Sequence, residues 1–115
     1  MDIPSTIKEL INTHGTCDPF RLCEFLDIEI IKHPLGTETR GLIKPYKRSY
    51  IICINSDLTE LDQLHTCAHE LGHYKLHKKV NTLFMRACTY LKTDIYEIEA
   101  NEFADRLLSI MFNDL

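Results

Sequence analysis

The sequence predicts an α+β fold in which a small three-stranded antiparallel sheet packs with helices. Three short segments in the first half are rich in β-branched and aromatic residues, whereas the rest of the chain repeats apolar residues at helical spacing. The chain has 115 residues, so we expect residues 1–115 to form a single domain. Its 44% hydrophobic and 26% charged residues are typical of a globular protein.

Two helices are expected before the first strand. Apolar residues at helical spacing, followed by Gly15 as a stop, predict a helix over Ile3–His14. Asp18 is a typical N-cap residue, and Pro19 suits the first position of a helix. A second, short helix is therefore predicted from Pro19 onward.

The three strands follow these helices. The first is Ile28–His33, which Pro34 and Gly36 end. The second is the weaker segment TRGLIK at residues 39–44, and the third is Ser49–Asn55, which is nearly all apolar. The sequence KPYKR between the last two is typical of a hairpin turn. We expect the three strands to pair as one antiparallel sheet.

Two further helices are predicted in the second half. A loose cap signature at Ser56 or Asp57, followed by apolar residues in steps of three and four, predicts a helix that runs through His77. The pattern weakens over 78–94, where we expect a loop or a short helix. The last helix is predicted over Ile95–Met111, with Ala100 central on its apolar face.

Charge and hydropathy argue against several classes of function. The net charge of −4 lacks the basic footprint of a nucleic-acid-binding protein, so no direct nucleic-acid binding is expected. No apolar stretch approaches the roughly 18 residues that cross a membrane, and the N-terminal sequence MDIPSTIKEL has no signal-peptide pattern. We therefore expect a cytoplasmic protein without membrane association. The five cysteines contain no C-x-x-C pair and are expected to be structural thiols: Cys17, Cys23, Cys53, Cys67 and Cys88.

Four histidines recur every four residues on the predicted central helix, at positions 65, 69, 73 and 77. Such residues lie on one ridge of a helix, which is either a metal site or a row of solvated side chains. Only His69 is followed by a glutamate, so only HELGH reads H-E-x-x-H. This pattern sets two imidazoles one turn apart to bind zinc and places a carboxylate in reach of the activated water. We predict His69 and His73 as zinc ligands and Glu70 as the catalytic base.

The other residues of this segment have weaker patterns. His65 and His77 have no adjacent acid and do not fit the spacing that delivers a third histidine ligand, so both are interpreted as supporting or structural. Gly72 lies within the motif, and a glycine inside a helix costs about 1 kcal/mol relative to alanine. We therefore expect another element to pass close to that turn.

The third ligand of a catalytic zinc has to come from another segment. The last helix offers Glu97, Glu99 and Glu102. At about 100° per residue, Glu97 lies inside the edge of the apolar face, Glu99 at its margin and Glu102 towards solvent. Glu97 is therefore the predicted ligand, and the alternative is a first-turn acid favoured by the helix dipole. Asn101, one turn further on, is expected to hydrogen-bond to Glu97.

These motifs together resemble the ImmA/IrrE family of zinc metallopeptidases. The resemblance covers roughly 50–108 and rests on a strand ending in Ile-Asn, the sequence AHELGHYKLH and the later sequence EIEANEFADRLL. It implies a compact α+β fold with a zincin-like active-site helix of the gluzincin type. Carried over to this chain, the implied ligands are His69, His73 and Glu97, with Glu70 as the base.

The resemblance also implies a substrate. Many family members are encoded by phages or mobile elements and cleave a helix-turn-helix repressor, which releases transcription. We therefore expect a zinc-dependent endopeptidase that cleaves such a repressor. The alternative is a non-cleaving zinc-binding interaction module, either an anti-repressor or a toxin–antitoxin component. The ending LLSIMFNDL departs from the Leu-Leu-Met-Pro that often ends this helix in the family, which implies a member of minimal length.

Overall fold

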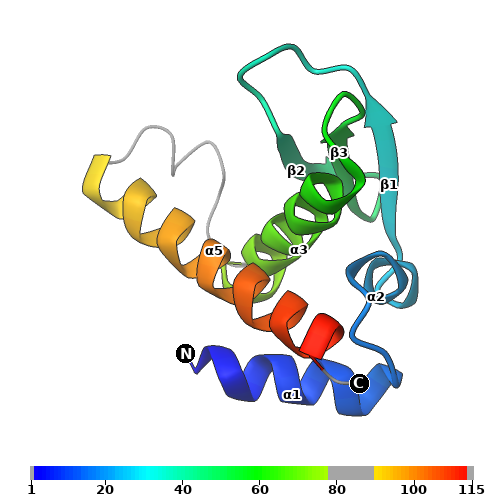
Figure 1. The fold of residues 1–115 in the computed structure, drawn as a ribbon, viewed down its shortest axis with the longest axis vertical. Coiled ribbons are helices and arrows are strands. Elements are labelled where there is room, and N and C mark those ends of the chain that lie inside the picture. The colour runs from blue at the N-terminus through cyan, green and yellow to red at the C-terminus, as the bar shows by residue number, and fades with distance from the viewer. Residues whose placement is uncertain (1, 78–89, 114–115) are drawn as a thin grey trace.

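A computed structural model describes residues 2–77 and 90–113, with side chains from residue 95 onward in the last helix. Figure 1 shows a small sheet packed against helices, as expected for the α+β class. In chain order the elements are α1 (Ile3–His14), α2 (Pro19–Phe25), β1 (Ile28–His33), β2 (Gly41–Tyr46), β3 (Ser49–Asn55), α3 (Glu60–Leu76) and α5 (Tyr90–Asn113).

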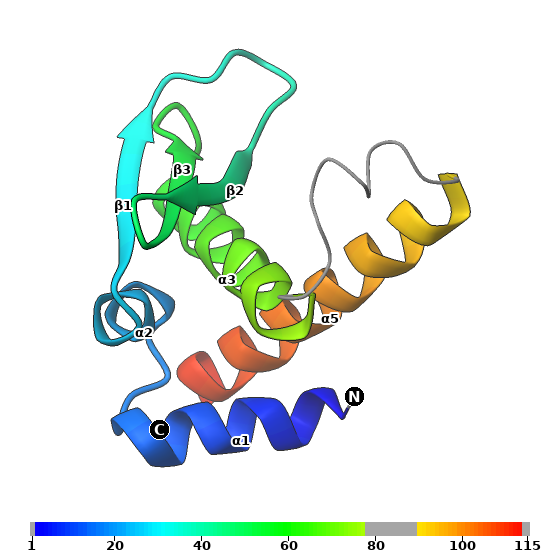
Figure 2. The same cartoon turned by 180° about the vertical axis from the view of Figure 1, so that it is seen from behind.

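The helix α3 is the central element of the fold. Figures 1 and 2 show the sheet on one side of α3 and α5 on the other. The helix α2 contacts both α3 and β1, and α1 packs against α5. The core between these elements contains fully buried apolar side chains, among them Leu22, Ile52, Ile54, Leu71, Phe103 and Leu107.

The sheet is mixed, so the prediction of a fully antiparallel sheet is wrong. Its strand order is β1-β3-β2, with β1 parallel and β2 antiparallel to β3. The strand β3 is central, and its nearly continuous apolar sequence suits this position because Ile51, Ile52 and Ile54 are all buried there. Pro45 lies in β2, at an edge of the sheet where a missing N–H is tolerated.

The buried Asn55 side chain holds the connection that carries the chain from β1 on one side of β3 to β2 on the other. Its Nδ2 donates to the carbonyl oxygens of Gly36 at 2.8 Å and Thr39 at 2.9 Å. Its Oδ1 accepts from the backbone N–H groups of Leu35 at 3.3 Å and Asp57 at 3.0 Å. Three of these bonds hold the connection between β1 and β2 across the end of β3, and the bond to Asp57 holds the turn that follows β3. The order of the strands along the sequence does not reveal that the chain crosses from one side of β3 to the other between β1 and β2.

The first two helices match their predictions, and the later two differ at their ends. Gly15 ends α1 with a φ of 72°, and Asp18 caps α2 by accepting from the N–H of Phe20 at 2.9 Å. The helix α3 begins at Glu60, later than expected, because Thr59 is its N-cap. The helix α5 begins five residues before the predicted start. The expected loop or short helix over 78–94 lies largely outside the described residues.

None of the helices among residues 2–77 and 90–113 is long and apolar enough to cross a membrane. The four cysteines in this part of the chain are free thiols, and the sulfur atoms of Cys23 and Cys67 lie 3.9 Å apart in the core. Hydrogen bonding to Cys23 and burial raise the pKa of the Cys67 thiol, which keeps it protonated. This environment fits the predicted structural role, while Cys88 lies outside the described residues.

Candidate metal centre

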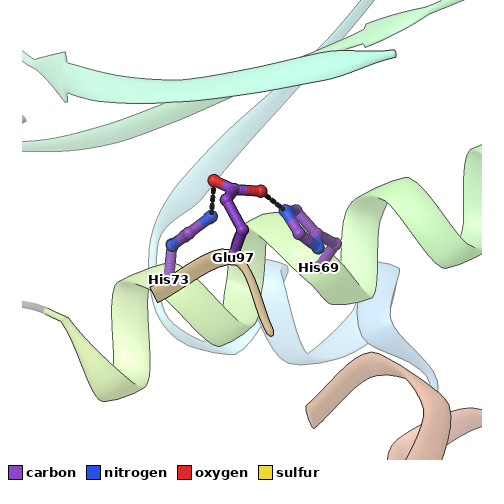
Figure 3. Close-up of side chains that lie close together, drawn as sticks. All are labelled: His69, His73 and Glu97. Carbon is purple, nitrogen blue, oxygen red and sulfur yellow. Dashed lines mark hydrogen bonds and ion pairs between the residues drawn. The ribbon is translucent and has the colours of Figure 1, made fainter. Parts of the chain in front are cut away.

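Three predicted ligands meet between α3 and α5. The Nε2 atom of His69 lies 3.0 Å from Oε2 of Glu97, and Nε2 of His73 lies 2.9 Å from Oε1 of the same carboxylate. Figure 3 shows both imidazoles pointing at this carboxylate. One donor atom from each side chain lies within 4.8 Å of the others, the one such group found in the described part of the chain.

Small residues allow α5 to approach the histidine ridge of α3. A Cβ atom at Gly72 would lie 3.1 Å from the ring of Phe103, so a larger residue would crowd the contact. Ala100 and Ala104 are fully buried in the same interface. The element expected to pass close to Gly72 is therefore α5. This close packing brings Glu97 within reach of two consecutive turns of α3.

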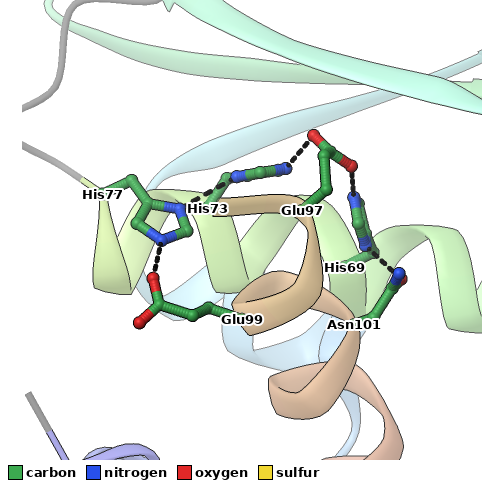
Figure 4. Close-up of polar contacts among 6 residues, drawn as sticks. All are labelled: His69, His73, His77, Glu97, Glu99 and Asn101. Carbon is green, nitrogen blue, oxygen red and sulfur yellow. Dashed lines mark hydrogen bonds and ion pairs between the residues drawn. The ribbon is translucent and has the colours of Figure 1, made fainter. Parts of the chain in front are cut away.

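The remaining ring nitrogen of each histidine has its own partner (Figure 4). Nδ1 of His69 lies 2.8 Å from Oδ1 of Asn101, and Nδ1 of His73 lies 3.0 Å from Nδ1 of His77. Asn101 was expected to support Glu97, but its hydrogen bond goes to His69 instead. Both Nε2 atoms consequently face a common point, with the Nδ1 atoms held from behind.

This donor set suits a divalent metal such as zinc. Two imidazole nitrogens and one carboxylate oxygen are the protein ligands of a familiar class of catalytic zinc sites. Tetrahedral zinc, with bonds of about 2.0–2.1 Å, would separate neighbouring donor atoms by roughly 3.3 Å. The observed nitrogen–oxygen distances of 2.9 and 3.0 Å are close to that value. Small side-chain movements would therefore suffice to admit the ion.

The acidic and basic groups of the cluster shift one another's pKa values towards their charged forms. The hydrogen bonds to His69 and His73 hold the pKa of the Glu97 carboxyl well below its usual range. Burial lowers the pKa of His69, but the hydrogen bond to Glu97 and the charges of Glu70 and Glu97 outweigh it, so the net shift is upward. In the metal-free protein, a proton on His69 therefore balances part of the negative charge of Glu70 and Glu97. A bound cation would balance the same charge.

Glu70 lies beside the cluster on α3 and is only 7% exposed. Burial raises the pKa of its carboxyl, and this outweighs the opposing effect of the positive charges on His69 and His73. A raised pKa makes the carboxylate a better proton acceptor near neutral pH. Glu70 has no direct bond to the three donor atoms in the described contacts, which suits a base better than a ligand.

The other candidate residues occupy different positions. His77 is buried and its Nε2 lies 2.9 Å from Oε1 of Glu99, whereas burial lowers the pKa of its ring. His65 pairs at 3.0 Å with Asp105, whose side chain is 73% exposed. Glu102 pairs with Arg106 on the outer face of α5. The contact between His77 and Glu99 was missed from sequence, although His77 lies one turn beyond a predicted ligand.

Comparisons with known proteins show the family of the chain. Residues 23–109 match the model of a peptidase family described as the IrrE N-terminal-like domain. "Uncharacterized immunity region protein 2" of Bacillus phage phi105 is 40% identical over 106 residues, which cover 92% of this chain and 67% of that protein. "Metallopeptidase ImmA" of Bacillus subtilis (strain 168) is 37% identical over 108 residues, which cover 92% of this chain and 62% of that protein. The chain thus spans about two thirds of the length of the phage protein and slightly less of the Bacillus subtilis protein.

Proposed function

This chain belongs to the ImmA/IrrE family of peptidases, and we propose that it is a zinc-dependent endopeptidase. The observation that carries the proposal is the meeting of His69, His73 and Glu97, from two helices, at one point. A purely structural role does not require two largely buried imidazoles to share one carboxylate. The family membership supports a metallopeptidase, and the donor set favours zinc among the metals that such sites hold.

In this proposal His69, His73 and Glu97 hold the ion. Zinc bound there supplies a Lewis acid that activates a water molecule and polarises the scissile carbonyl. Asn101 and His77 orient the two imidazoles through their Nδ1 atoms, so the ligand nitrogens are fixed before the ion arrives.

Glu70 acts as the general base. It takes a proton from the attacking water and passes it to the nitrogen of the leaving amine when the peptide bond breaks. Its burial supports this role because the raised pKa brings the carboxyl closer to the operating pH.

The sheet offers a place for an extended substrate. The strands β2 and β3 contact α3, and in both close-ups the sheet passes over the ligand cluster (Figures 3 and 4). In the described residues β2 pairs with β3 on one side only. A peptide that adds to its free edge would form main-chain hydrogen bonds and present its backbone to the site.

We infer that the substrate is a helix-turn-helix repressor. This choice is supported by the family resemblance and by a relative that is named as a phage immunity-region protein.

The test combines the purified protein with a helix-turn-helix protein encoded beside its gene. Mass spectrometry should detect two repressor fragments in the presence of zinc and none with a chelator or with Glu70→Gln. A stable complex of the two proteins without fragments would instead favour the non-cleaving interaction module. Absence of both fragments and complex would reject this substrate class.

A further inference from the structure

We propose that His77 and Glu99 are positioning residues that hold His73 in the orientation and tautomer that bind the metal. The proposal rests on the metal centre of the proposed function. It concerns a buried histidine and an acid that the ligand set does not include. Figure 4 shows the continuous row Glu99, His77, His73 and Glu97, which links the two helices.

The geometry of this row is defined at each step. Oε1 of Glu99 lies 2.9 Å from Nε2 of His77, and Nδ1 of His77 lies 3.0 Å from Nδ1 of His73. The far nitrogen of His73, Nε2, faces Glu97 at 2.9 Å. Both ring nitrogens of His77 are therefore engaged, one towards each helix.

The direction of the hydrogen bonds follows from the donor inventory. An ionised carboxylate only accepts, so Nε2 of His77 carries the hydrogen that is donated to Glu99. A neutral imidazole has one N–H group, so Nδ1 of His77 accepts from Nδ1–H of His73. In the metal-free protein Nε2 of His73 donates its own hydrogen to the Glu97 carboxylate, and a bound metal would replace that hydrogen. The lone pair of His73 would then be on Nε2, the atom that faces the proposed ion, while Nδ1–H stays directed at His77. Glu99 thus sets the tautomer of a ligand that it does not touch.

Packing fixes the ring of His77 in this position. The residue is only 7% exposed, and its ring lies 4.5 Å from that of Tyr96 between centroids. His65 provides a contrast on the same ridge, because it pairs with the exposed Asp105 and has no described contact with a ligand. A histidine–acid pair on this ridge is therefore not sufficient for a positioning role. The contact with His73 is what distinguishes His77 from His65.

The test compares zinc affinity and one NMR signal across matched variants. His77→Phe keeps a ring of similar size but removes both hydrogen bonds, and we expect zinc affinity to fall about 10- to 100-fold in a chelator competition. His77→Gln retains an acceptor and a donor and should recover much of that loss. His65→Phe, the matched control, should bind zinc like the wild type.

The NMR signal reports on the tautomer itself. In the zinc-loaded wild type, the Nδ1 proton of His73 should be protected from exchange with water, and this protection should be lost in His77→Phe. Glu99→Ala alters a half-exposed side chain, so it tests the same row with little risk to folding. It should weaken zinc binding and speed this exchange.

Three outcomes separate this proposal from the proposed function. Wild-type zinc affinity and exchange in Glu99→Ala and in folded His77→Phe would overturn the positioning role alone. A wild-type protein that binds no zinc would overturn the metal centre and the positioning role together. A protein that binds zinc, shows the expected variant effects and cleaves no repressor would support the positioning role and reject the substrate.

Discussion

The ring of Phe103 on α5 lies directly over Gly72 on α3, so that a Cβ atom at position 72 would be 3.1 Å from three of its side-chain carbons. This contact limits how closely the two helices that carry the proposed ligands can approach. Phe103 is fully buried and has little room to move. In the proposed metal centre the glycine therefore acts through packing and not through contact with the ligands.

Gly72→Ala should destabilise the protein and weaken zinc binding. The gain of about 1 kcal/mol in helix propensity is opposed by overpacking, which typically costs about 1–3 kcal/mol. We expect a net loss of roughly 1 kcal/mol in a denaturant titration, with reduced zinc affinity. In the background of Phe103→Leu the same substitution should cost less, because the smaller side chain relieves the crowding. Equal costs in both backgrounds would show that this contact does not limit the approach.

Glu70→Gln should separate metal binding from catalysis. Glutamine is nearly isosteric with glutamate but is a poor proton acceptor, so zinc content should remain near one ion per chain while cleavage disappears. Elemental analysis and a repressor cleavage assay check the two results. Loss of zinc in this variant would make Glu70 a ligand and exclude it as a base in the form proposed.

Local sequence signals predicted much of the fold. Gly15 and Asp18 marked helix ends through their own backbone and side-chain preferences, and the structure has both ends in place. The placement of β1 was not predictable in this way, because the connection that follows it is held by three hydrogen bonds that Asn55 forms with residues distant in sequence. The start of α3 shifted because Thr59 caps it in preference to earlier candidates.

In the site, too, the features set by one helix were predictable and the contacts between helices were not. Spacing on one helix identified His69 and His73, and the helical phase of α5 selected Glu97, because each inference used one regular element. The partners Asn101 and Glu99 depend on how the two helices cross, which periodicity does not encode. Asn101 was consequently paired with the wrong residue, and the contact of Glu99 with His77 was not foreseen.

Asn55→Ala should test the account of the mixed sheet. The substitution removes four hydrogen bonds, three of them to backbone groups of the connection, and an unsatisfied backbone group costs about 1–3 kcal/mol when buried. Because the connection is partly solvated, we expect a loss of about 2–3 kcal/mol in unfolding free energy. Asn55→Asp keeps the two acceptor contacts and should show an intermediate loss. A change within about 0.5 kcal/mol for Asn55→Ala would contradict this role.

The metal-free site should depend on pH through His69. Its pKa is raised above 6.5 in the folded protein, so the charged pair with Glu97 stabilises the fold at pH below 6.5 and loses this effect as pH rises through the folded value. On the acid side, the lowered pKa of Glu97 means that its contribution is present above about 4.5 and is lost as pH falls towards the folded value.

An NMR titration of the metal-free protein should therefore place the His69 midpoint above 6.5. In Glu97→Gln the midpoint should fall, because burial still lowers the pKa and one favourable carboxylate is gone. Zinc competes with the same proton, so zinc affinity should decrease by about tenfold per pH unit below the His69 midpoint. A His69 midpoint that is unchanged in Glu97→Gln would contradict the charged pair.

The most direct test of the central claim is a zinc titration of Glu97→Ala beside Glu102→Ala. Both variants remove a glutamate from α5, but Glu97 bonds to both histidines whereas Glu102 pairs with Arg106 on the outer face. Loss of a residue that only supports a metal ligand typically weakens metal binding about 10- to 100-fold. We predict that Glu97→Ala, which removes a ligand, weakens zinc binding by more than this. Glu102→Ala should match the wild type at one zinc per chain. Equal zinc binding by the two variants would contradict the assignment of His69, His73 and Glu97 as the metal centre.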